Sequence, residues 1–292
     1  DASLIRIYFR YICVQNRSMY TEYQPSHLLV PYIDNYWEFK GNPDYGMRIH
    51  ILPDGCTDFI FTLGEVANAV EEGSLMMQPY RSYFVGPMTK YSELVTYAES
   101  VHMFGVRFLP CGLSCFTNLP LHEFVNSRVS TNEMKAVFDD TFIERLCEQK
   151  HIADRIRVVE EYLLAYLARH YQPADSHVAM AVNMINHSKG KRSVRSLMDD
   201  VCLCQRHFER KFKHYTGFTP KEYSRIVKFK NAVELLRTTT SANLLTTAVD
   251  AGYYDLAHFS KEIKSMSGNT PASFLSLTVP EETTLTYIEP QR

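Results

Sequence analysis

The sequence predicts a multidomain α+β protein. Its N-terminal part is expected to be a β barrel or sandwich followed by a helical segment, and its C-terminal part an all-α domain with two helix-turn-helix units. Three observations predict this class: short strand-like runs up to residue 108, helical periodicity from about residue 131, and an internal repeat after residue 205. A length of 292 residues is enough for about two domains.

The strand-like region extends from Tyr32 to about Phe108. Aromatic and β-branched residues occur there in short runs that Gly, Pro, Asn and Asp separate, as is typical of hairpins: YWEFK, RIHIL, DFIFTL, YFVG, SELVTY and MFGVRF. Pro53-Asp54-Gly55 is a turn tripeptide that leads into one of these runs. Because closure removes exposed strand edges, this many short strands favours a closed or sandwiched β domain.

Helical periodicity begins near Thr131. An apolar stripe follows, stepping by four, three, four and three residues on one helix face: Ile152, Ile156, Val159, Leu163 and Tyr166. Such a stripe can pack against the β domain, or it can form a dimer seam through Ile152, Ile156, Val159 and Leu163. The pattern is too short to separate these alternatives. The stretch Tyr171 to Ser176, which contains Pro173, is expected to be a linker.

The C-terminal part divides into helices. The predicted ranges are Val178 to His187, Val194 to Asp200, Gln205 to His214, a helix of about 18 residues from Pro220, Leu244 to Ala251, and Leu256 to Ser265. Gly190 follows the first helix end and Gly252 lies in a turn. Thr219 and Glu222 are spaced as a capping box at the start of the long helix. At 1.5 Å per residue that helix spans about 27 Å.

One segment occurs twice in this region. His207-Phe208, Arg210, Lys213, Gly217, Thr219-Pro220 and Tyr223 recur 51 positions later as His258-Phe259, Lys261, Lys264, Gly268, Thr270-Pro271 and Phe274. A fixed offset with basic residues matched to basic ones indicates two copies of one small helical unit. Each copy has the pattern of a helix, a tight turn and a second helix that can enter a DNA major groove.

The repeat predicts which side chains face DNA. Phe208 and Phe212 in the first unit, and Phe259 and Ile263 in the second, are expected inside. The expected DNA-binding residues are Gln205, Arg206, Glu209, Arg210 and Lys213, and in the second unit Leu256, Ala257, His258, Lys261 and Lys264. Arginine and glutamine can bond base edges, whereas the two lysines Lys213 and Lys264 are expected on phosphates. Leu256 and Ala257 offer only apolar contact, so the second unit is expected to be less specific. For any one of these residues, a solvated surface charge is the alternative.

The charge distribution supports this division. Residues 180–277 carry 15 basic and 8 acidic side chains, a net charge of +7, whereas residues 1–179 carry 15 basic and 22 acidic ones, a net charge of −7. Only the C-terminal part is therefore expected to meet phosphate. Seven cysteines show no disulfide framework, and no run is long and apolar enough for a membrane span, so a cytoplasmic location is expected.

These residues resemble the DNA-binding domain of the AraC/XylS family of bacterial transcription regulators. The resemblance rests on GYYDLAHFSKEIKSMSGNTPASF and on FERKFKHYTGFTPKEY followed by KFKNAVELL. It implies a seven-helix domain that binds promoter DNA and recruits or blocks RNA polymerase. The N-terminal segments LPDGCTDFIFTLG, YFVGPMT and FGVRFLPCG are similar to a domain of some of these regulators, which implies a cupin-like sensor of a small-molecule effector. The chain departs from the family's pattern at Met198, Cys202, Cys204 and Thr247, which puts the first unit's turn in question.

The chemistry of the N-terminal part stays open. Arg107 and His102 are the candidate effector residues, Arg107 because it can pair an anionic effector; the alternative, which the sequence favours, is an ordinary edge or interface arginine. A metal or thiol redox sensor is an alternative, because Cys111 and Cys115 lie four residues apart, but the ligand pairs are isolated and no metal or other cofactor is expected. A ligand-independent regulator whose N-terminal part only dimerises is another. No nucleophile elbow, phosphate-binding loop or metalloprotease helix is present, so the chain is not expected to be an enzyme.

The expected partners are double-stranded promoter DNA, RNA polymerase and a small-molecule effector, with a homodimer as the assembly. The expected domain bounds are an N-terminal extension over 1–18, a β sensor domain over 19–130, a helical linker or dimerisation segment over 131–172, the DNA-binding domain over 173–277 and a tail over 278–292.

Overall fold

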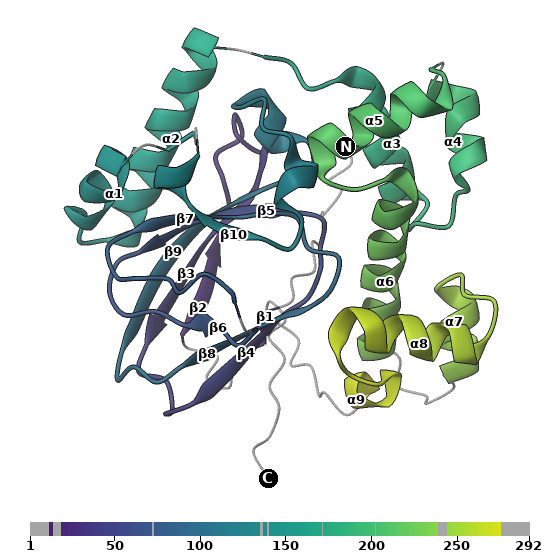
Figure 1. Ribbon diagram of the computed structural model, residues 1–292, viewed down its shortest axis with the longest axis horizontal. Helices are drawn as coiled ribbons and strands as arrows, with labels where there is room; N and C mark the ends of the chain where they lie inside the picture. Colours follow the sequence, from purple (N-terminus) through teal and green to yellow (C-terminus); the bar gives the residue numbers. More distant parts are fainter. Residues whose placement is uncertain are drawn as a thin grey trace.

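The computed structural model describes residues 12–13, 19–71, 73–134, 137–138, 140–170, 172–201, 203–238 and 244–275. Figure 1 shows a β domain with two helices on its outer side, and beside it a helical domain built around one long helix. Most of the expected 1–18 extension, the 278–292 tail, Tyr171 and Cys202 lie outside the described residues. The domain bounds expected from the sequence stay a prediction.

The described strands form two antiparallel sheets. The four-stranded sheet has the order β1 (Ile12–Cys13), β4 (Met47–Ile51), β8 (Ser92–Thr96), β6 (Asn68–Ala69). The six-stranded sheet has the order β10 (Arg128–Ser130), β7 (Ser82–Val85), β5 (Thr57–Thr62), β9 (Val101–Phe108), β3 (Ile33–Gly41), β2 (Tyr20–Tyr23). The six predicted runs are all strands, and the predicted β sandwich is confirmed.

The large sheet separates two cores. Along β9, Val101 and Met103 face the small sheet, in a core with Trp37 and Ile49. The alternate residues face outward, where the second core joins the sheet to α1 (Asp140–Cys147) and α2 (Ile152–His170). Among the described residues this part also has the 3₁₀ helices η1 (Gly112–Cys115), η2 (Leu121–Phe124) and η3 (Thr131–Glu133).

The apolar stripe of α2 packs against the β domain. Val159 and Leu163 are fully buried in the outer core, and Ile152 and Ile156 pack against it. A dimer seam through these four residues would require the stripe to be exposed, so that prediction is wrong. The alternative, packing against the sheet, is the one the structure has.

The helical domain matches the predicted helices to within three residues at every end that the sequence placed. Its elements are α3 (Ser176–His187), α4 (Val194–Val201), α5 (Gln205–Thr216), α6 (Pro220–Thr238), α7 (Leu244–Asp250), α8 (Leu256–Ser267) and α9 (Pro271–Leu275). Figure 1 shows α6 running from α3–α5 at one end to α7–α9 at the other. The predicted inward residues Phe208, Phe212, Phe259 and Ile263 are all fully buried.

The capping box that starts α6 is confirmed. The backbone N–H of Thr219 donates to Oε2 of Glu222 at 2.7 Å, and the N–H of Glu222 donates to Oγ1 of Thr219 at 3.2 Å. The two bonds satisfy backbone donors that a helix start otherwise leaves unpaired. They fix the point where the long helix begins.

The two units end their second helices in the same way. Gly217 after α5 and Gly268 after α8 are left-handed, with φ of 82° and 74°. Each glycine N–H donates to the lysine carbonyl four residues earlier, Lys213 or Lys264. Only glycine adopts this conformation at low cost, which explains why both copies of the repeat keep it.

The two domains share buried surface. Leu52 and Cys111 of the β domain belong to the hydrophobic core of the helical domain. Beside them Gly55 meets the ring of Tyr223, and Nζ of Lys230 on α6 donates to the carbonyl of Asp54 at 3.1 Å. The turn at Pro53-Asp54-Gly55 is therefore the part of the β domain that packs against α6. No described helix combines the length and the apolar character that a membrane crossing needs.

Candidate nucleic-acid interface

The helices α5 and α8 expose matching faces, which we call the recognition faces. On α5 the exposed residues include Gln205, Arg206, Arg210 and Lys213, with Glu209 half-buried. On α8 the residues at the same positions of the repeat, Leu256, Ala257, Lys261 and Lys264, are exposed as well, together with His258. Every residue expected at DNA therefore lies at least partly open to solvent.

In the described part of the chain, the basic side chains on the recognition faces are not paired with acidic residues and are free to bind phosphate. Within the described residues, Arg206, Arg210 and Lys213 form no ion pair or side-chain hydrogen bond, and neither do Lys261 and Lys264. Five uncompensated cations on two helices provide the positive potential that phosphate binding requires.

Gln205 differs from its neighbours. Its side-chain amide donates to Oε1 of Glu209 at 2.9 Å. Glu209 thus orients the glutamine and lowers the local positive charge. To bond an adenine edge, Gln205 would first have to break this bond.

Two ion pairs that the sequence did not reveal hold the recognition helices. Arg225 on α6 donates to both carboxylate oxygens of Glu262 on α8, at 2.7 and 3.0 Å. Lys211 on α5 donates to Asp175 at 2.6 Å, and Asp175 also caps α3. The only sequence signal was an acidic residue within a basic helix, which does not identify its partner.

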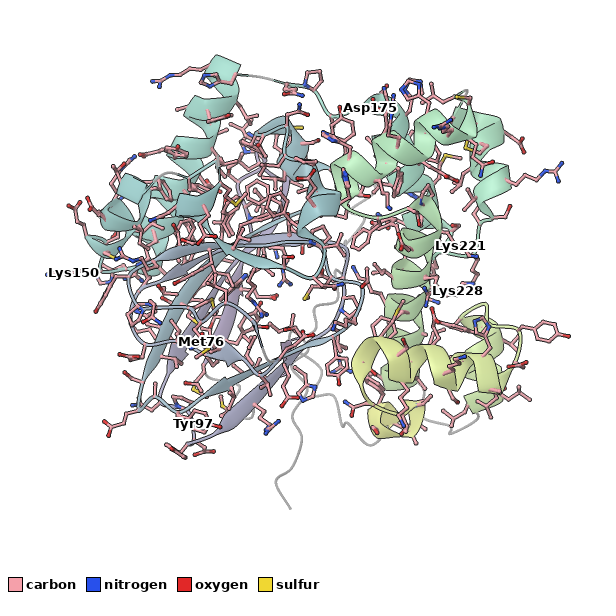
Figure 2. All side chains as sticks on the ribbon, viewed as in Figure 1. Met76, Tyr97, Lys150, Asp175, Lys221 and Lys228 are labelled. Carbon is pink, nitrogen blue, oxygen red and sulfur yellow. The ribbon has the colours of Figure 1, made fainter. Side chains whose placement is uncertain are left out.

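Basic side chains also line the helix between the two faces. Figure 2 shows Lys221 and Lys228 on the side of α6 that points away from the β domain. Lys221 is exposed, and Nζ of Lys228 donates to the carbonyl of Gly252 in the turn before α8. Neither lysine has a basic counterpart 51 positions later, so the repeat does not single them out.

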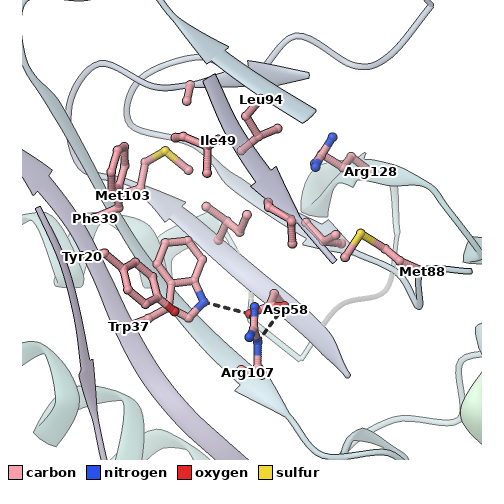
Figure 3. A pocket seen from close by; sticks show the side chains of 14 residues that line it. Tyr20, Trp37, Phe39, Ile49, Asp58, Met88, Leu94, Met103, Arg107 and Arg128 are labelled. Carbon is pink, nitrogen blue, oxygen red and sulfur yellow. Dashed lines mark hydrogen bonds and ion pairs between the residues drawn. The ribbon is translucent and has the colours of Figure 1, made fainter. Parts of the chain in front are cut away.

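A cavity lies between the two sheets of the β domain (Figure 3). Its internal volume is about 40 Å³, room for a few water molecules in this conformation. Its walls are mostly apolar, from Trp37, Phe39, Ile49, Leu94 and Met103 among others, and its charged residues are Asp58, Arg107 and Arg128. This is the composition of a small-molecule site: an apolar body with a few polar groups.

Arg107 lines this cavity but is already paired. Its Nε lies 3.0 Å from Oδ1 of Asp58, and its Nη1 lies 3.2 Å from Oδ2 of Asp54. Burial alone would lower the pKa of Arg107, but the carboxylates of Asp58 and Asp54 outweigh it and hold the pKa well above its usual value. Because two carboxylates surround it, Arg107 serves less well as an anion receptor than the sequence suggested.

His102 is not part of the cavity. It lies on the opposite face of β9 from Arg107, where Nε2 is 2.9 Å from Oε1 of Glu38. The same carboxylate oxygen accepts from Arg155 of α2 at 3.2 Å. His102 and Arg107, both expected to bind an effector, therefore lie on opposite faces of β9, and only Arg107 lines the cavity.

Arg128 is the cavity residue that the sequence analysis missed. Its Nη2 donates to the hydroxyl of Ser92 at 3.0 Å, while its Nε is buried without a hydrogen-bond partner among the described residues. Burial lowers the pKa of this guanidinium, since no carboxylate lies close enough to compensate fully. A strand as short as β10 gives no clear sequence pattern, so this residue could not be placed beforehand.

Three of the described cysteines are buried, and Cys147 and Cys204 are exposed. Burial raises the pKa of Cys56, Cys111 and Cys115, which disfavours the reactive thiolate. Among the described residues, no three metal-ligating side chains of His, Cys, Asp or Glu gather at one point.

Two family models match the chain. Residues 21–130 match a domain of unknown function, DUF6597, and residues 197–276 match a helix-turn-helix domain. The second match covers both units of the repeat. Among curated proteins none matches the chain.

Several solved structures are similar. ToxT from Vibrio cholerae has 8% sequence identity and a TM-score of 0.48, covering 82% of this chain and 97% of that one. An unsaturated-fatty-acid-bound ToxT from Vibrio cholerae strain SCE256 has 11% identity and a TM-score of 0.46, covering 85% and 98%. An AraC-type regulator from Chromobacterium violaceum has 23% identity and a TM-score of 0.32, covering 34% and 89%. These values are too low to transfer the function of those proteins.

Proposed function

We propose that the chain is a transcription regulator of the AraC type, whose helices α5 and α8 bind two successive major grooves of a promoter through the helix-turn-helix domain matched over residues 197–276. The observation that carries this proposal is the pair of recognition faces, exposed at corresponding positions. The connecting helix α6 has 19 residues, a length of about 28 Å. That is near the repeat of one DNA turn, about 34 Å, so one monomer is expected to cover roughly 20 base pairs.

We further propose that the β domain senses a small-molecule effector in the cavity between its sheets. The apolar walls favour an effector whose larger part is apolar. Arg128 offers a cation for an anionic group of the effector, because no carboxylate in the described part of the chain lies within salt-bridge distance of it. Arg107 then has a structural role, because its ion pairs with Asp58 and Asp54 hold the cavity wall in place. It does not bind the charged group of the effector.

The partners implied by the family resemblance complete the proposal. The protein acts in the cytoplasm as a homodimer and recruits or blocks RNA polymerase at the bound promoter. Because the stripe of α2 is buried, a dimer has to use another surface. Analytical ultracentrifugation of the full chain measures this state directly.

Selection of bound fragments from genomic DNA tests the main proposal. The full chain is expected to enrich a small set of fragments with a shared motif of roughly two half-sites. Enrichment that follows base composition alone, with no shared motif, would contradict sequence-specific binding.

Arg210→Ala and Lys264→Ala separate base reading from phosphate contact. Arg210→Ala is expected to weaken binding to the selected site by about 1–3 kcal/mol and binding to random DNA far less, because arginine can bond a guanine edge bidentately. Lys264→Ala is expected to weaken binding to all sequences and to reduce the salt slope by about one. Binding titrations at several salt concentrations measure both. If Arg210→Ala weakens random and selected DNA equally, Arg210 contacts only phosphate.

A further inference from the structure

One loop of the β domain reaches both units of the repeat. Residues 86–91 connect β7 to β8 and contain Pro87, Met88 and Tyr91. A Cβ on Gly217, the glycine that ends α5, would lie 2.5 Å from Cγ of Pro87. A Cβ on Gly268, the glycine that ends α8, would lie 2.8 Å from Cζ of Tyr91. The two glycines that repeat 51 positions apart thus rest on residues four apart in one loop.

These contacts are part of packed surfaces. Tyr91 packs against the core of the helical domain, and its ring stacks on His50 of β4 with 5.8 Å between ring centroids. Pro87 is buried, and beside it Nε2 of His214 at the end of α5 lies 2.9 Å from Oδ1 of Asn118. Each recognition helix therefore has its C-terminal end seated on the β domain, while its exposed face stays open.

The same loop lines the cavity. Met88, between Pro87 and Tyr91, is one of the lining residues, and Figure 3 shows it on the same side of the view as Arg128. The loop is also tied to its neighbour: the N–H of Thr89 donates to Oδ1 of Asn126 at 2.9 Å, and the N–H of Asn126 donates to the carbonyl of Pro87 at 2.8 Å. The residues on either side of Met88 are thus both bonded to Asn126.

We propose that the 86–91 loop is a regulatory clamp: Met88 responds to what fills the cavity, and Pro87 and Tyr91 hold the ends of α5 and α8 in the spacing that DNA requires. This inference rests on the proposed function and adds the route by which the effector acts. The docked state is the DNA-competent one, because docking fixes both helix ends and covers neither recognition face. A ligand in the cavity displaces Met88. The loop then moves, which changes the packing of Pro87 against the end of α5 and of Tyr91 against the end of α8.

Hydrogen exchange of the full-length protein tests the clamp without any ligand. Tyr91→Ala is expected to speed exchange in residues 264–268 by about threefold or more, with 213–217 unchanged, since local opening follows the loss of the contact. Pro87→Ala gives the reverse pattern. Met88→Ala speeds exchange in both segments at once. Tyr97→Ala is the matched control, because this exposed tyrosine lies at the far end of β8 from the helical domain (Figure 2).

Several outcomes overturn the proposal. If Tyr91→Ala behaves like Tyr97→Ala, the loop does not hold α8. If Met88→Ala leaves both segments unchanged, the cavity is not coupled to the helices. Should Tyr91→Ala accelerate exchange throughout the β domain, Tyr91→Leu replaces it, because leucine keeps apolar bulk but is too short to reach Gly268.

Binding to the selected DNA gives the second measurement. Tyr91→Ala is expected to weaken it by about three- to tenfold, with binding to random DNA unchanged; unchanged or tighter binding to the selected site would show that docking is not the DNA-competent state. If the wild-type protein prefers no DNA sequence at all, the proposed function fails, but the exchange pattern still decides whether the clamp exists.

Discussion

Cys204 and Asp255 hold the same position in the two units, at the N-terminal caps of α5 and α8. The carboxylate of Asp255 accepts a hydrogen bond from the N–H of His258 at 2.7 Å. The side chain of Cys204 makes no capping hydrogen bond, since sulfur is a weak acceptor. The first recognition helix therefore starts with an uncapped backbone, although the repeat shows what a cap in this place looks like.

Replacing this one atom tests the difference. Cys204→Ser is expected to raise the free energy of unfolding by about 1 kcal/mol, because serine is a strong N-cap. Urea denaturation followed by circular dichroism measures it. Asp255→Ala is the counterpart in the second unit and is expected to lower the free energy of unfolding by a similar amount. An unchanged stability of Cys204→Ser would mean that α5 gains nothing from a cap.

At the scale of elements, α2 shows how one pattern can have two meanings. Its stripe was visible in the sequence, but the partner of the stripe was not, because a helix face facing a sheet and one facing a second copy have the same periodicity. In the structure the outer face of the large sheet covers it, with Leu163 fully buried. The choice between the two alternatives depends on tertiary contacts.

Substitution within α2 distinguishes packing from dimerisation. Leu163→Ala is expected to cost about 2–5 kcal/mol of stability, since it leaves a cavity in the outer core, and to leave the oligomeric state unchanged. Leu164→Ala makes the same chemical change at a half-buried neighbour and should cost less. Thermal unfolding measures the stability, and sedimentation measures the oligomeric state. A dissociated oligomer with unaltered stability would restore the dimer seam.

The helices of the C-terminal part could be predicted closely, and the cavity could not. Helix ends such as Thr219 and Gly217 carry local signals, because caps depend on residues within one turn. The partners of Arg107, by contrast, come from a turn 53 positions earlier and from the adjacent strand β5. Strands β2 and β10 were missed because they are short and partly polar. Contacts between distant segments leave no periodic trace in the chain.

On the scale of the whole molecule, the two domains are joined by more than a linker. The turn that carries Leu52 and Gly55 packs into the helical domain, and the 86–91 loop seats both recognition helices. Because Leu52 lies in a core whose other members are mostly helical, the helical domain does not complete its own interior alone. The two domains are therefore expected to unfold in one cooperative transition.

Trp37, the single tryptophan, lies in the β domain and reports on it alone, whereas most of the helical signal comes from outside that sheet. In denaturant the two signals are expected to change together in the wild-type protein. Leu52→Asp is expected to separate them, with helix lost first, because it places a charge in the core of the helical domain. Leu28→Asp is the control, since Leu28 is 54% exposed. Two separate transitions in the wild type would show that the domains unfold independently.

The position of Leu52 also has a consequence for the design of chimeric regulators. A chimera that joins these helices to the sensor domain of another protein would leave a cavity at the place of Leu52 in the helical core. The β domain left without its helices would expose the Leu52 side chain to solvent. A chimera that keeps the turn of residues 52–55, which connects β4 of one sheet to β5 of the other, together with the helices it packs against avoids this loss.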